Sequence, residues 1–205
     1  MPTPNQETVK QVLAIGDRAA LIRGAVEDSW SKVSTEFADL AWWRRKTTRA
    51  ALVWEYAVQA AIEALAGDPG VRVVRHHDTV SFVIDETVLI RFKKANIELK
   101  SSNYPTFLAQ LFHDHEVPDL FGLGELQRVE AAYVLNRFQT GIVWVGMVAR
   151  DKRQVSWNFE LVPASGAEII ELPTRTEPVA PAADAVIQPR GTATSDDEKS
   201  GKEGE

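Results

Sequence analysis

Three carboxylates and one lysine could together supply the chemistry of a metal-dependent hydrolase. Glu55, Asp85 and Glu98 precede Lys100, which follows the last of these acids by two residues. Two such acids can hold Mg²⁺ through their oxygens, and a neighbouring lysine can support the attacking water. One hypothesis is therefore a Mg²⁺-dependent nuclease or hydrolase that uses Glu98, Lys100 and an acid from Asp85 or Glu55.

The spacing of Asp85, Glu98 and Lys100 resembles the core motif of the PD-(D/E)xK nucleases. The expected strands argue against that use of the residues. Asp85 falls in a turn, and Glu98 lies past the far end of the next strand, about 40 Å away if the chain stays extended at about 3.3 Å per residue. We therefore favour a binding role without a cofactor, in which Asp85 is a turn residue and Lys100 a surface or phosphate-contacting base.

A second group that could bind a metal contains two histidines. His113 and His115 alternate with Asp114 and Glu116, so four oxygen or imidazole groups follow one another. Side chains at positions i and i+2 of a helix point to different sides, so the histidines converge only if the helix has already ended. A histidine at a helix C-terminus is also stabilised by the helix dipole. A metal site at His113 and His115 is kept as the alternative.

A run of basic and polar residues favours binding of an anion. Helix N-termini and hydroxyl or amide side chains are good partners for phosphate. The run stands beside an expected helix start, and an alternating strand pattern puts its first bases on one exposed face. We predict that this face binds nucleic acid or an acidic protein surface. Its residues are Arg91, Lys93, Lys94, Lys100, Ser102 and Asn103.

The periodicity of apolar residues predicts the elements that must position these groups. Residues 5–66 follow helical spacing, with a break expected at Gly16 or Gly24 and a hinge between Ser29 and Thr35. Beyond a Gly-Asp-Pro-Gly stop the period changes to two, which predicts two groups of three strands separated by a helix that ends near His113. The order ααβββαβββ indicates an α+β domain whose N-terminal helices pack on antiparallel meanders. The expected strands are 71–76, 80–84, 88–93, 126–135, 142–149 and 155–161.

The turn between the second and third strands can be predicted from the register. If residues 85–87 form a three-residue loop, Ile84 faces Val88 and Phe82 faces Ile90. The apolar residues then share one face, as a half-buried antiparallel pair requires.

The charge of the chain is unevenly distributed. The 205 residues carry a net charge of −6, but residues 163–205 alone hold nine acids and four bases, while residues 1–162 hold 20 acids and 19 bases. The terminal segment is rich in Pro, Ala and Glu and lacks aromatic residues, so we expect a single domain over 1–162 and a mostly disordered tail over 163–205. The acidity of the chain therefore does not argue against an anionic partner for the domain.

Composition excludes several classes of protein. The absence of cysteine excludes disulfides, thiol nucleophiles and metal sites with cysteine ligands. No apolar run approaches the ~18 residues of a membrane span, and the N-terminus lacks the layout of a signal peptide. These features predict a cytoplasmic protein with no membrane partner, and they do not indicate an oligomeric state.

The segment 90–94, the segment 101–106 and the strand around Tyr133 resemble a set of small uncharacterised proteins from phages and bacterial genomes. The similarity spans about residues 71–161. That set has no agreed activity, so the resemblance implies a bacterial or phage setting and directs attention to the basic strand. A component of a toxin–antitoxin or phage-defence pair stays open as a further alternative to the binding module.

Overall fold

The computed structural model describes residues 4–38, 46–76, 78–101, 107–116, 122 and 125–162, without the side chains of 46, 107 and 108. The expected tail over 163–205 lies outside the described residues. None of the helices in the described ranges is long and apolar enough to cross a membrane.

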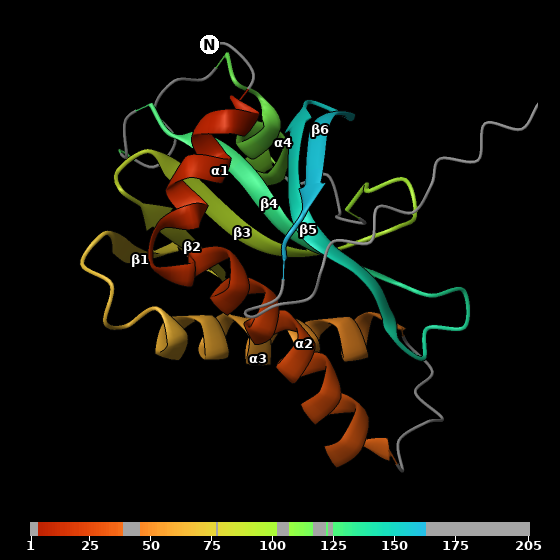
Figure 1. The fold of residues 1–205 in the computed structure, drawn as a ribbon. Coiled ribbons are helices and arrows are strands. Elements are labelled where there is room, and N and C mark those ends of the chain that lie inside the picture. The colour runs from red at the N-terminus through yellow and green to blue at the C-terminus, as the bar shows by residue number, and fades with distance from the viewer. Residues whose placement is uncertain are drawn as a thin grey trace, which may run out of the picture. The chain divides into compact units, whose positions relative to one another are not determined.

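The N-terminal part is helical, as predicted (Figure 1). Helix α1 (Gln6–Ala14) is capped by Asn5, whose side chain accepts a hydrogen bond from the Thr8 amide at 3.1 Å. The predicted break falls at Gly16, which has a φ of 59° inside a short 3₁₀ helix, η1 (Ile15–Asp17). The break at Gly24 and the hinge between Ser29 and Thr35 are wrong, because the helix that follows continues through both. Two longer helices follow, α2 (Arg18–Glu36) and α3 (Lys46–Ala64).

The remaining elements form one six-stranded sheet in the order β1-β2-β3-β4-β5-β6. All neighbouring strands are antiparallel except β3 and β4, which are parallel. The fold is therefore α+β, and this parallel pair, which the sequence did not predict, joins the two meanders. The strands are β1 (Val71–His76), β2 (Thr79–Ile84), β3 (Val88–Ala95), β4 (Gln127–Leu135), β5 (Ile142–Asp151) and β6 (Gln154–Glu160).

The turn between β2 and β3 is the predicted three-residue loop. Ile84 pairs with Val88 and Phe82 pairs with Ile90. Asp85 and Glu86 take φ values of 49° and 46°, so two consecutive non-glycine residues of this turn have left-handed backbone.

The two faces of the sheet bury different material. On one face, Phe82, Ile90 and Met147 join a large apolar core with residues of α2 and α3. The helix that crosses between β3 and β4, α4 (Phe107–His113), packs on the other face, where Phe112 contacts Val83 and its neighbours. A third cluster on this second face surrounds Ala132. The candidate site lies at β3, which has side chains on both of these faces.

Candidate functional site

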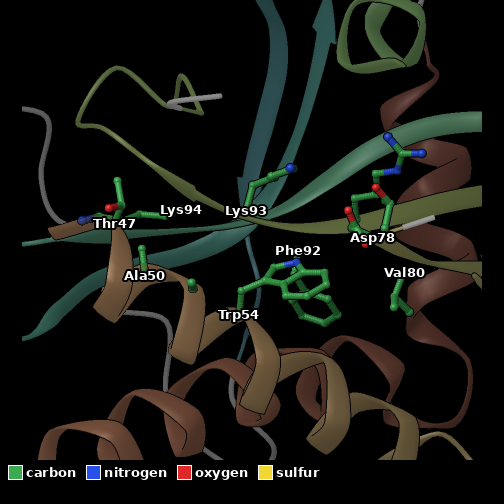
Figure 2. Close-up of a pocket in the computed structure, with 11 residues that line it drawn as sticks. Thr47, Ala50, Trp54, Asp78, Val80, Phe92, Lys93 and Lys94 are labelled. Carbon is green, nitrogen blue, oxygen red and sulfur yellow. The ribbon is translucent and has the colours of Figure 1, made fainter. Parts of the chain in front are cut away.

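A pocket of about 550 Å³ lies between the N-terminal half of α3 and β3 (Figure 2). Only residues Phe82–Ile84 of β2 pair with β3. The residues at the start of β2 are not paired with β3 in this register, and they line the pocket. The lining residues are Thr47, Ala50, Ala51 and Trp54 of α3, Asp78, Thr79 and Val80 around the start of β2, and Arg91, Phe92, Lys93 and Lys94 of β3.

The pocket combines an apolar wall with basic side chains. Trp54 extends from α3 toward β3, while Lys93 points away from α3 (Figure 2). Neighbouring strand residues point to opposite faces, so Lys94 lies on the face of the sheet that is turned toward α3. Its Nζ is 3.5 Å from Oε1 of Gln139, in the turn between β4 and β5. The two lysines that line the pocket therefore project from opposite faces of β3.

The charge of Lys93 is influenced by residues on the face of the sheet that α4 covers. Burial lowers the pKa of Lys93, the Glu130 carboxylate opposes that shift, and the charge of Arg91 adds to it. An anion bound beside Lys93 would stabilise the charged ammonium group in the same way as Glu130 does.

Arg91 is buried, and the prediction that it belongs to an exposed basic face is wrong. Only 6% of the residue is exposed, and its guanidinium carbon lies 4.2 Å from the centre of the Phe112 ring. Its Nε donates a hydrogen bond to Oγ of Ser81 at 3.0 Å. Burial lowers the pKa of Arg91 to about 10, so the side chain stays charged at neutral pH. The sequence pattern around Arg91 does not indicate this burial, because the burial depends on α4 covering the strand.

A buried carboxylate on β4 organises the charges next to Arg91. Glu130 is 1% exposed, and its Oε1 accepts a hydrogen bond from Ser101 at 3.0 Å and lies 3.2 Å from Nε2 of His113. Nη1 of Arg150 lies 3.8 Å from the other carboxylate oxygen. Burial alone would raise the pKa of Glu130, but His113, Arg150 and Ser101 together outweigh it and hold the pKa below its usual value.

This cluster is better suited to a structural role than to catalysis. The Ser101 hydroxyl donates to Glu130 and accepts from Nη1 of Arg150 at 2.7 Å. A carboxylate with a lowered pKa is a poor base for activating a hydroxyl near neutral pH. Ser101 instead links the segment after β3 to β4 and β5.

The residues of the hydrolase hypothesis are not brought together. Asp85 is bound through both carboxylate oxygens to the Arg18 guanidinium at 2.6 and 3.1 Å, and Glu98 pairs with Lys100 at 2.8 Å. Asp85 precedes and Glu98 follows the eight-residue strand β3, which separates them by about 25 Å. Glu55 is exposed on α3. One Mg²⁺ ion with ligands at about 2.1 Å cannot bridge such a separation.

The two histidines take different partners. His113 ends α4 beside Glu130, whereas Nε2 of His115 lies 2.7 Å from the backbone oxygen of Arg150. The pKa of His115 is lowered, chiefly by burial. In the part of the chain that the structure describes, no group of three or more His, Cys, Asp or Glu residues could hold a metal ion.

The other predicted binding residues divide into two groups. Lys100 is exposed at the turn after β3, where it pairs with Glu98. Ser102 and Asn103 lie outside the described residues.

Several residues of the site and its support were not singled out from the sequence. Trp54 and Asp78 line the pocket from elements distant in sequence, and no local pattern marks them. Arg128 and Glu130 did carry a signal, because they alternate on one face of an otherwise apolar strand. Arg18, which joins Asp85 and Asp68, gave none.

The chain was compared with protein-family models, with curated proteins and with solved structures, and none of them matched.

Proposed function

We propose that this chain is a binding module that holds an anionic partner, either nucleic acid or an acidic protein, in the pocket between α3 and β3. The observation that carries the proposal is the position of Lys93 and Lys94, which line one pocket together with Trp54 and Phe92. Of the basic and polar residues that the sequence suggests for binding, the proposal therefore relies on Lys93 and Lys94. Arg91 adds positive charge from its buried position.

The charge and size of the pocket both support this proposal. Its lining contains three bases and one acid, Asp78. Charge interactions are stronger at such a partly enclosed site than in open water. A volume of about 550 Å³ is in the range of small-molecule sites, so a partner can insert one terminal group or one side chain.

The enzyme alternative has less support in the geometry. Asp85 and Glu98 each form an ion pair with a base of the chain itself. A role in a toxin–antitoxin or phage-defence pair also requires a surface that binds a partner, and the same pocket could provide that surface. We propose a cytoplasmic setting in bacteria or phage-infected cells, on the basis of the cysteine-free composition and the resemblance at segment 90–94.

The test compares two double variants that lose the same charge. Lys93→Gln with Lys94→Gln removes the two lysines of the pocket. Lys10→Gln with Arg153→Gln removes two exposed bases on α1 and on the turn between β5 and β6. Fluorescence anisotropy at low salt would measure the binding of two labelled anions, a single-stranded dT 20-mer and a polyglutamate 20-mer.

At about 1 kcal/mol per charge contact, loss of both pocket lysines should weaken binding of at least one anion roughly thirtyfold. The control variant should bind as the unmodified protein does. Equal binding by all three proteins, or no binding of either anion, would refute the proposal.

A further inference from the structure

The turn between β4 and β5 presents an aromatic side chain to solvent. Phe138 is 80% exposed, and the neighbouring Arg137 is exposed as well. The turn itself is well bonded, because the Asn136 amide donates to the Gly141 oxygen at 2.9 Å and the Asn136 side chain bonds to Thr140. An exposed aromatic ring on an ordered turn is available for contact with a partner.

This turn adjoins the pocket. Oε1 of Gln139 lies 3.5 Å from Nζ of Lys94, which lines the pocket, and 3.3 Å from Nη2 of Arg49 on α3. The hairpin of β4 and β5 extends toward the N-terminal end of α3 (Figure 1). Lys94 and Gln139 therefore connect the pocket with the turn that carries Phe138.

The turn that follows β3 also presents an apolar side chain to solvent. Ile97 in this turn is 83% exposed. Leu99 of the turn and Trp144 of β5 both pack against the cluster around Ala132. Segments 93–101 and 136–143 together hold four bases and one acid, Glu98, whose carboxylate pairs with Lys100.

We infer that the partner of the pocket is a single-stranded nucleic acid whose chain runs from Lys93 and Lys94 past Gln139, with one base stacked on Phe138. This inference rests on the proposed function and names its partner. Aromatic side chains beside a basic track are typical of proteins that bind single strands, because every base has a face that can stack. An acidic peptide would use the lysines, but it has no comparable need for an exposed ring. A duplex would keep its base faces covered.

The test uses substitutions of Phe138 that should not affect folding, because the side chain is exposed. Phe138→Ser removes the ring and Phe138→Tyr keeps it. Ile15→Ser changes another exposed apolar residue, located in η1. The probes are the labelled dT 20-mer, its duplex with dA 20-mer and the polyglutamate 20-mer, all measured by fluorescence anisotropy.

Binding of the single strand should weaken roughly tenfold in Phe138→Ser and stay within about twofold of the unmodified protein in Phe138→Tyr and Ile15→Ser. Binding of the polyglutamate peptide should not respond to Phe138→Ser. These results would support the inference.

The failures of the two proposals can be distinguished. If the lysine variant weakens binding but Phe138→Ser does not, the stacking inference is refuted and the pocket proposal stands. Preference for polyglutamate or for the duplex would have the same meaning. If neither the nucleic acids nor the peptide binds, both proposals fail.

Discussion

The two faces of the sheet are both largely buried, but they are stabilised in different ways. The face toward α2 and α3 is apolar, with Phe82, Ile90 and Met147 in the core. The face toward α4 buries Glu130 and Arg91 among smaller apolar clusters. The first face depends on the hydrophobic effect, which needs no particular partner for each residue. The second face is stable only if its charges are paired, so single changes there should act through charge and not through volume.

The largest effect should come from a truncation on the apolar face. Phe82 is fully buried and packs edge-on against Phe92, with ring centres 5.5 Å apart. Phe82→Ala should lower the free energy of unfolding by about 4 kcal/mol, because it removes buried surface and leaves a cavity. Urea unfolding measures this loss. Val143→Ala, at an exposed position of β5, serves as the control and should change stability by less than about 0.5 kcal/mol.

A smaller loss should follow when the charge on the other face is removed without changing its shape. Glu130→Gln removes a buried negative charge that stabilises Arg91 and Arg150, which should cost about 3 kcal/mol of unfolding free energy. Glu116→Gln, in an exposed ion pair with Lys152, should show no measurable loss in the same urea experiment. Equal stability of Glu130→Gln and the unmodified protein would contradict the distinction between the faces.

A third site of paired charge lies at the start of α2, where Asp68 is more exposed to solvent than its partner Arg18. The Arg18 guanidinium, with the Gly70 amide, lowers the pKa of Asp68 from 3.8 to about 2. A carboxyl group whose pKa is lower in the folded than in the unfolded state stabilises the folded state at a pH above its unfolded-state pKa. This contribution is lost as the pH falls through the folded-state pKa. Asp68→Asn should therefore melt below the unmodified protein at pH 7. The difference should shrink between about pH 4 and pH 2.

Thermal melts at pH 7, 4 and 2.5 would measure that difference. Glu63→Gln on α3 is a matched control, and its melting temperature should follow the unmodified protein throughout. A constant gap between Asp68→Asn and the unmodified protein would show that the Asp68 charge is not the origin of the effect.

The sequence predicted the apolar face better than the charged one. Alternation of apolar residues was sufficient to place all six strands and the three-residue turn at Asp85, because local periodicity determines which side chains share a face. The parallel pairing of β3 with β4 was missed, since periodicity carries no information about which strands become neighbours. The burial of Arg91 was missed for a related reason, because it depends on α4 lying over the strand.

The candidate site was predictable only in its bases. Lys93 and Lys94 stand out in the sequence as a charged run within a strand. Trp54 and Asp78 reach the same pocket from other elements, and only the tertiary structure brings them there. Phe138 has no local signature either, since most aromatic residues in such patterns are buried.

The salt dependence of binding to the dT 20-mer tests the central claim most directly. Each phosphate contact on a single strand contributes about −0.7 to the slope of log K against log salt concentration. Lys93→Gln with Lys94→Gln should therefore make the slope less negative by about 1.4, while Lys10→Gln with Arg153→Gln should leave it unchanged. The same slope for both double variants would contradict a nucleic-acid site at the pocket between α3 and β3.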